Sequence, residues 1–394
     1  MAAEPGRLWA PGDPPAGLYI HIPFCRFLCT YCAFSKEIYV RDRAERWLAG
    51  LERELWVRSR ESFAGRLRVD TVFLGGGTPS ALTAGQIERL GELLARHLEF
   101  DASLEFTTEA NPESFTAGIA AAFRAIGVNR VSLGAQSFDR RELELLGRPH
   151  GIDAPARAVS VARDSGFDNV SVDVMYGLPA QDLATFARSV DAVLDLETEH
   201  VSAYCLGLEP GTPLAVSVAE GALPAPDDDA ARDQYDHLVA AVEARGYEVY
   251  EISNFARKGR EAAHNLKYWR REDCFALGPS SHALVRNHRW ANPAGLDRWV
   301  AAYAETGRPP RPRPVPEDLA RFEYVFLHLR LSEGLDPGGY RERWGRRFED
   351  DYADPLERMV DRGLLVRAGG RIRLAPRARF VSDAVFAEFA PAES

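Results

Sequence analysis

The chain has 394 residues, of which 27% are charged and 46% apolar or aromatic, and its formal net charge is -10. This length predicts two or three domains with ample chain for a large core. The acidic balance argues against general nucleic-acid binding, which needs many Lys and Arg to neutralise phosphates. No apolar run approaches the roughly 18 to 20 residues that span a bilayer.

The first two-thirds of the chain alternates β-rich runs with longer amphipathic stretches. Helices are predicted at residues 39–60 and 84–98, and six strands at residues 18–22, 69–74, 104–108, 130–133, 170–174 and 200–206. Such alternation indicates repeated β/α units around a parallel sheet. Six units predict an α/β fold with an incomplete (β/α)6 barrel that is open on one side. Its active site would lie where the strands end.

A change in composition and in the predicted elements at residue 309 indicates a second domain. The proline-rich run 309–314 is typical of a stiff linker. Helices are predicted at 319–331 and 356–363, and a hairpin joins 364–367 to 371–374 through Gly369 and Gly370. We expect a small helical, winged-helix-like domain here. The full division is an N-terminal extension (1–17), the barrel (18–255), a connecting segment (256–308) and the C-terminal domain (309–394).

Three cysteines with the spacing C-x3-C-x2-C follow the first predicted strand: Cys25, Cys29 and Cys32. Three thiolates can hold three irons of a cubane 4Fe–4S cluster and leave the fourth iron free for chemistry. The alternative is zinc, which normally requires a fourth Cys or His in a closed site, and His21 is poorly placed to supply one. Clustered cysteines in an odd total of five favour metal binding in a reducing compartment, hence the cytoplasm.

The motif resembles that of the radical S-adenosylmethionine (SAM) superfamily, in which the methionine moiety of SAM binds the open iron. Glycines 75–77 and Thr78 follow the second strand, so their backbone can approach a ligand and offer it N–H groups and carbonyls. Polar residues recur near later strand ends, on the expected catalytic face. The resulting SAM set is Tyr19, Tyr31, Gly76, Gly77, Thr78, Glu109, Gln136, Arg148 and Asp173.

Eight sequence strings narrow the resemblance. They are YIHIPFC, FLGGGTPS, TTEANPE, RVSLGAQSFD, LGRPH, VDVMYGLPAQ, YEVYEISNFA and HNLKYW. In order and spacing they resemble oxygen-independent coproporphyrinogen III oxidases, and most of all the heme chaperone (HemW) branch of that family. Phe34 stands where the oxidases carry a further cysteine, and 17 residues precede the first strand where the oxidases have a long covering segment. Ala33 and the run 278–282 depart from the usual family pattern.

The string HNLKYW (264–269) matches a motif that the chaperone branch uses for heme. The resemblance implies that His264 ligates heme iron beside Tyr268 and Trp269, with His282 and Cys274 as alternative ligands. On the residues alone, a structural histidine next to a core tryptophan is the simpler interpretation.

The function implied is a heme chaperone with a 4Fe–4S cluster, SAM and heme, which delivers heme to acceptor proteins, respiratory ones among them. It would need an electron donor for the cluster and no nucleic acid. The alternative is a coproporphyrinogen III oxidase, which decarboxylates propionates in porphyrin biosynthesis. The sequence leaves open whether SAM is cleaved, and therefore whether the protein is an enzyme. It also leaves open whether the protein forms a dimer or contacts a membrane transiently.

Overall fold

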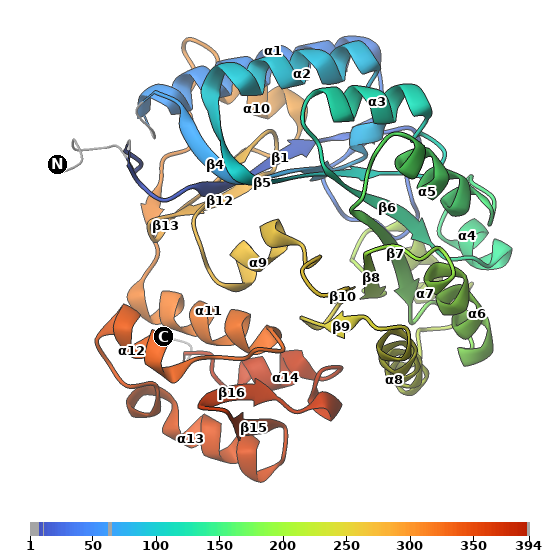
Figure 1. The fold of residues 1–394 in the computed structure, drawn as a ribbon, viewed down its shortest axis with the longest axis vertical. Coiled ribbons are helices and arrows are strands. Elements are labelled where there is room, and N and C mark those ends of the chain that lie inside the picture. Colours follow the sequence, from blue (N-terminus) through green and yellow to red (C-terminus); the bar gives the residue numbers. More distant parts are fainter. Residues whose placement is uncertain (1–7, 11, 62–64, 392–394) are drawn as a thin grey trace.

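The computed structural model describes residues 8–10, 12–61 and 65–391, and its centre is one open, curved sheet (Figure 1). Most of the predicted N-terminal extension therefore lies outside the described residues. The six predicted strands are present and pair in parallel in chain order: β1 (Ala16–Ile22), β4 (Leu67–Gly76), β5 (Leu98–Ala110), β6 (Arg130–Gln136), β7 (Val170–Tyr176) and β8 (His200–Cys205). The predicted α/β fold with an incomplete barrel is confirmed.

Further strands, which the sequence analysis did not predict, lengthen the sheet at both edges. Beside β1 it gains β11 (Cys274–Leu277), which is parallel, and then β12 (His282–Val285), β13 (His288–Ala291) and β14 (Arg313–Pro314), which are antiparallel. Beyond β8 it gains β10 (Asn254–Ala256) and β9 (Glu248–Val249). The segment 256–308 thus contributes to the main sheet, and the end of the proline-rich run, which was predicted to be a stiff linker, forms the edge strand β14.

Helices cover the convex face of the sheet, as Figure 1 shows. They are α1 (Arg41–Glu61), α2 (Ala84–His97), α3 (Ala117–Ala125), α4 (Arg140–Leu145), α5 (Ala154–Asp164), α6 (Leu183–Leu194), α8 (Asp228–Ala244) and α10 (Leu296–Ala302). The short helix α7 (Pro213–Ala219) instead packs at the strand ends, where Leu214 N donates to Thr30 O. Several begin at a side-chain cap. For example, the Thr83 hydroxyl accepts from the Gln86 N–H, and Gln86 accepts from the Thr83 N–H. The concave face is left for α9 (Ala263–Trp269) and for the ends of the strands.

The C-terminal unit has its own aromatic core, built around Tyr324, Tyr340 and Phe348. Its helices are α11 (Glu317–Arg330), α12 (Pro337–Trp344), α13 (Phe348–Asp361) and α14 (Ser382–Ala387). The predicted hairpin is β15 (Leu365–Ala368) with β16 (Arg371–Leu374), and both turn glycines have positive φ. No helix in the described part of the chain has both the length and the apolar character to cross a membrane.

One buried carboxylate joins α1 to the unpredicted part of the sheet. Glu54, which is fully buried, accepts hydrogen bonds from Gly278 N (2.8 Å), Trp299 Nε1 (2.9 Å) and Asn292 Nδ2 (2.6 Å). These partners belong to the β11–β12 loop, to α10 and to the segment after β13. The carboxylate therefore satisfies donors from three segments distant in sequence.

We predict that Glu54→Ala lowers the free energy of unfolding by about 3 kcal/mol or more, because several buried donors lose their acceptor. Glu52→Ala is the matched control on the same helix, since its pair with Arg96 is solvent-exposed and should contribute no more than about 1 kcal/mol. Urea denaturation of both variants measures the difference. Equal losses would contradict a special role for Glu54.

Candidate functional site

A cavity of about 410 Å³ lies at the carboxyl ends of the parallel strands. Its lining includes nearly all of the predicted cluster and SAM residues: Cys25, Cys29, Tyr31, Cys32, Gly76, Gly77, Thr78, Glu109, Gln136, Arg148 and Asp173. Positions spread over about 150 residues of sequence are thus brought to one concave surface, as a β/α barrel does with its loops.

The cysteine loop begins at β2 (Phe24–Cys25), which pairs with β3 (Glu37–Ile38). Burial raises the pKa of the Cys25 thiol to about 11, and burial also raises that of Cys29. The ammonium group of Lys36 donates to the Cys32 carbonyl and lies near the thiols. Thiolates are the form that binds metal, so the free energy of iron binding must offset the cost of deprotonating these buried thiols. Within the described residues no three Cys, His, Asp or Glu side chains are arranged around a single ion. A cubane cluster instead places each cysteine on a different iron.

The glycine loop is held against the strand that leads to the cysteines. Gly76 has φ of +111°, and a Cβ at Gly77 would lie 2.8 to 2.9 Å from backbone atoms of Phe24 and Ile22. Only glycine fits such an approach. Gly77 N donates to Ile22 O (2.8 Å) and Thr78 N to Phe24 O (2.7 Å).

Gly76 N donates in turn to Glu109 Oε2 (3.1 Å). The loop N–H groups are therefore used internally, contrary to the expectation that a ligand would receive them. Carbonyl oxygens, with two lone pairs each, are what this loop can offer, and an ammonium group suits them.

A chain of polar contacts leads from an arginine to the first cysteine. Arg148 donates to Asn111 Oδ1 (2.6 Å) and to Tyr31 OH (3.1 Å). Asn111 Nδ2 donates to Thr78 Oγ1 (3.2 Å), whose hydroxyl lies 3.5 Å from Cys25 Sγ. The Arg148 Nε atom is buried without an acceptor in the described part of the chain. A buried guanidinium with an unused donor fits a carboxylate ligand.

Two carboxylates without an ion-pair partner among the described residues face the same cavity. Burial, followed by the charge of Asp173, raises the pKa of Glu109 to about 7. Burial also raises the pKa of Asp173, whose Oδ1 accepts from Ser132 Oγ (2.9 Å). Desolvated carboxylates gain most from a cationic partner. Together with Arg148, the cavity fits a ligand that carries both positive charge and a carboxylate, as SAM does.

Gln136 lies at an irregularity of the sheet. Its φ is +68°, and the β6–β7 register shifts between Gly134 and Gln136. A non-glycine residue in this region stores strain of roughly 1 to 3 kcal/mol, and such strain clusters at ligand sites. The bulge places Gln136 on the cavity wall.

Tyr19 differs from the rest of the predicted SAM set, because it does not line the cavity. Its hydroxyl lies 3.0 Å from His21 Nδ1, and its ring stacks on Phe73. The His21 ring lies directly beneath Gly76, where a Cβ would come within 2.5 Å of it. Tyr19 therefore supports the glycine loop through His21.

The cavity also contains residues that were not selected from the sequence. They are Phe27, Phe34, Lys36, Ala110, Asn111, Ser132, Gly134, Met175 and Tyr204. Asn111 and Tyr204 could have been found, since both lie at the carboxyl end of a strand. Met175 likewise lies near the carboxyl end of β7, whereas Ser132 lies in the middle of β6, without a strand-end position to mark it.

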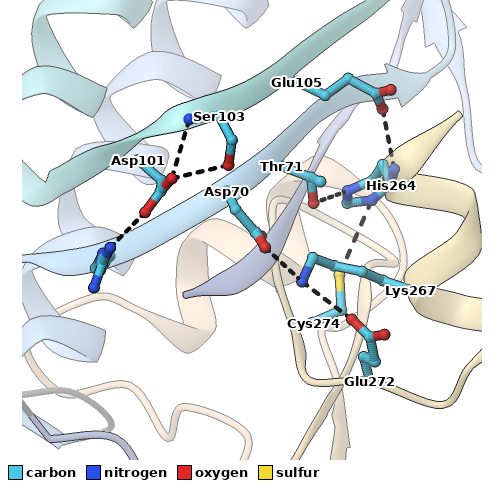
Figure 2. A network of polar contacts seen from close by, with 10 residues as sticks. Asp70, Thr71, Asp101, Ser103, Glu105, His264, Lys267, Glu272 and Cys274 are labelled. Carbon is cyan, nitrogen blue, oxygen red and sulfur yellow. Dashed lines mark hydrogen bonds and ion pairs between the residues drawn. The ribbon is translucent and has the colours of Figure 1, made fainter. Parts of the chain in front are cut away.

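The predicted heme motif lies elsewhere, in α9 on the concave face (Figure 1), and Figure 2 shows His264 beside Thr71 and Glu105. His264 is fully buried, with Nδ1 2.9 Å from Thr71 Oγ1 and Nε2 3.0 Å from Tyr268 OH. Burial lowers its pKa to about 3, so the ring is neutral. The backbone N–H groups of Ala263 and His264 donate to the Glu105 carboxylate. Both ring nitrogens of His264 are thus occupied by protein groups.

The remaining aromatic residues of the motif, Tyr268 and Trp269, lie in different environments. Tyr268 and the buried Cys274 stay with His264, and Cys274 Sγ lies 3.6 Å from Tyr268 OH. Trp269 is half-buried and lies under the Arg330 guanidinium, 4.3 Å from the ring centroid. His282, the remaining alternative ligand, is exposed at the start of β12.

Comparison with known proteins identifies the class to which this fold and cavity belong. Residues 19–193 match the Radical SAM superfamily and residues 315–381 the HemN C-terminal domain. The structure is similar to that of coproporphyrinogen III oxidase (HemN) from Escherichia coli, with a TM-score of 0.84, 25% identity and coverage of 96% of this chain and 91% of the other. The chain is a radical SAM protein, and membership of that superfamily implies a 4Fe–4S cluster and SAM.

Curated relatives give the family. The chain is 33% identical to the heme chaperone HemW of Bacillus subtilis over 94% of its length and 98% of the relative. It is 36% identical to the heme chaperone HemW of Mycobacterium tuberculosis strain H37Rv over 97% and 96%. The chain belongs to the HemW family.

We predict that anaerobic reconstitution gives about four irons per chain and that Cys25→Ser, Cys29→Ser and Cys32→Ser each abolish stable iron content, because every thiolate holds its own iron. Cys205→Ser, at an exposed cysteine, is the matched control and should retain full iron content. Iron and sulfide analysis with EPR of the reduced protein measures this. Loss of the cluster in Cys205→Ser would contradict the assignment.

We also predict that Arg148→Gln and Asp173→Asn each weaken SAM binding at least tenfold (about 1.4 kcal/mol), because the ligand loses a desolvated charge partner, while iron content is retained. The surface pair Arg245–Asp195 supplies controls of the same residue types, Arg245→Gln and Asp195→Asn. Equilibrium dialysis of reconstituted protein provides the affinities. Unchanged SAM binding in both cavity variants would refute the proposed site.

Proposed function

We propose that this protein is a cytoplasmic heme chaperone whose Cys25, Cys29 and Cys32 hold a 4Fe–4S cluster, whose strand-end cavity binds SAM, and which passes heme to acceptor proteins. The observation that carries the proposal is the cavity, which combines three cysteines, an arginine with one unused donor and two desolvated acids. The heme part is supported by the HemW relatives, which are named heme chaperones.

The alternative is coproporphyrinogen III oxidase activity, which the similarity to the Escherichia coli oxidase structure supports. Phe34 favours the chaperone. Its side chain lines the cavity and is 71% exposed, at the position where the oxidases carry a further cysteine. A large apolar group replaces a thiol at the mouth of the site.

The position of His264 bears on how heme would be bound. Iron ligation by His264 would require one of its two hydrogen bonds, to Thr71 or to Tyr268, to break, and heme would have to reach a fully buried ring. We therefore assign to His264 the positioning of α9, and to the carboxyl end of that helix, at Trp269 and beyond, the contact with heme.

We predict that reconstituted wild-type protein binds hemin with a stoichiometry near one and forms no protoporphyrinogen from coproporphyrinogen III, SAM and a reductant. The Escherichia coli oxidase assayed in parallel is the positive control. Hemin titration and chromatographic product analysis give the two results. Decarboxylation by this protein would overturn the chaperone proposal, and so would a failure to bind hemin.

A further inference from the structure

The inner face of the barrel carries polar residues below the SAM cavity. On β6, Ser132 and Gly134 line that cavity, so the alternation of the strand places Arg130 on the same face, one step further from the strand end. The same alternation operates on β7 and β8, where Asp173 and Tyr204 line the cavity. The inward positions below the cavity are Arg130, Ser171, His200 and Ser202. A β/α barrel usually fills this space with branched apolar side chains, so a polar interior calls for a functional explanation.

Arg130 is a buried cation without a direct partner. Its side chain is 2% exposed, and its Nε atom lacks an acceptor. No hydrogen bond or ion pair from another described residue reaches its guanidinium group. A buried charge is costly unless opposite charge compensates it. The positive charge of Arg130 must therefore be balanced by acids that lie near it without direct contact.

Two acids lie close to Arg130 on the adjoining strands. In the register of the sheet, Arg130 is paired with Thr107 of β5, and Glu109, two residues further along the same face, is paired with Ser132. Ser132 Oγ in turn donates to Asp173 Oδ1 of β7 (2.9 Å). Glu109 and Asp173 thus stand on either side of the strand that carries Arg130, one step closer to the cavity.

The charges around the two acids act in opposite directions. Burial raises the pKa of Glu109 to about 7 and the charge of Asp173 adds to this effect, whereas the hydrogen bond from Gly76 N and the charge of Arg130 oppose it. Burial likewise raises the pKa of Asp173, and the Ser132 hydroxyl and Arg130 oppose that effect. Arg130 is thus the cation that acts on both carboxyl groups.

The other titratable groups that face these acids are uncharged near neutral pH. Tyr19 of β1 and Tyr204 of β8 are phenols whose pKa is raised by burial. His200 of β8 and His264 of α9 are neutral, because burial lowers the pKa of each ring. Arg148 is held by its hydrogen bonds on the side of the cysteine loop. The compensating charge for the two acids therefore comes from the barrel interior.

We propose that Arg130 is a positioning residue for SAM, whose buried guanidinium supplies the positive charge that keeps Glu109 and Asp173 ionised together. The inference rests on the proposed SAM binding and adds a residue that does not itself line the cavity. Two ionised acids against one buried cation leave a net negative charge, which attracts the cationic sulfonium ligand. Without Arg130 the two desolvated acids would share a proton, as neighbouring carboxyl groups do, and that negative charge would be lost.

The first test is the pH dependence of SAM affinity, measured by equilibrium dialysis of the full reconstituted chain. Arg130→Gln should move the midpoint of binding upward by about one pH unit, because the acids lose the charge that favours their ionised form. Affinity should then fall about fivefold at pH 7 and match wild type near pH 9, where the acids ionise without help. The titration of SAM itself is common to all variants and cancels in the comparison.

Two further variants separate the charge of Arg130 from its packing. Arg130→Lys retains a cation and should keep the wild-type midpoint. Arg58→Gln removes another buried arginine, which is 1% exposed and donates to Tyr303 OH beneath the helices of the convex face. It should leave the midpoint unchanged even where it lowers stability. An unshifted midpoint in Arg130→Gln, or the same shift in Arg130→Lys, would overturn the inference.

A measurement on SAM-free protein covers the case in which the Arg130 variants do not fold. The infrared difference between wild type and Glu109→Gln isolates the carboxylic C=O band of protonated Glu109. This band should be half-lost near pH 7, because the pKa of Glu109 is about 7, and absent at pH 9. A Glu109 that stays protonated at pH 9 would refute the role of Arg130.

The two possible failures are distinguishable. Reconstituted wild-type protein that binds no SAM at any pH refutes the proposed function, and the inference with it. Normal SAM affinity in wild type, with an Arg130→Gln midpoint that does not move, refutes the inference alone.

Discussion

The packing of α9 against the inner face of the sheet is the contact on which the rest of the arrangement depends. Glu105 of β5 accepts from the first backbone N–H groups of α9, and Lys267 inserts its ammonium between Asp70 and Glu272 (Figure 2). Because Lys267 is only 9% exposed, removing Asp70 would leave its ammonium with the more exposed Glu272 as its ion-pair partner, and removing Lys267 would leave Asp70 without its cation. Through these contacts α9 occupies one end of the concave face. The other end, at the carboxyl ends of the strands, contains the cavity.

A continuous series of ring contacts joins the two ends. The His264 ring packs on Phe73 (5.3 Å between centroids), Phe73 on Tyr19 (6.2 Å), and Tyr19 on His21 (6.0 Å), which supports Gly76. Close-packed interiors have low compressibility and therefore transmit strain from one group to its neighbours. The position of α9 and the shape of the glycine loop are thus mechanically related, although the two lie at opposite ends of the same strands.

The sequence was most informative where the spacing of apolar residues and the residue types at turns and strand ends indicate the same structure. The six parallel strands, the Gly369–Gly370 hairpin and the residues at the strand ends were all predictable, because alternation, turn glycines and strand-end polarity are local signals. β11 was not, since Cys274–Leu277 is four residues long and buried throughout, without alternation. The N–H groups of the glycine loop were assigned to a ligand because their real acceptors, Ile22 and Phe24, lie more than 50 residues away.

The histidine of the heme motif shows most clearly that a sequence pattern cannot reveal contacts between residues distant in the chain. His264 lies in a motif with an aromatic neighbour at i+4, and the sequence alone cannot show that Thr71, from strand β4, occupies its Nδ1 atom. A metal ligand is defined by a free lone pair and an anchored ring, and both properties belong to tertiary structure. A search for ligands in such a protein should therefore weigh which nitrogen remains unused above which residue stands in a motif.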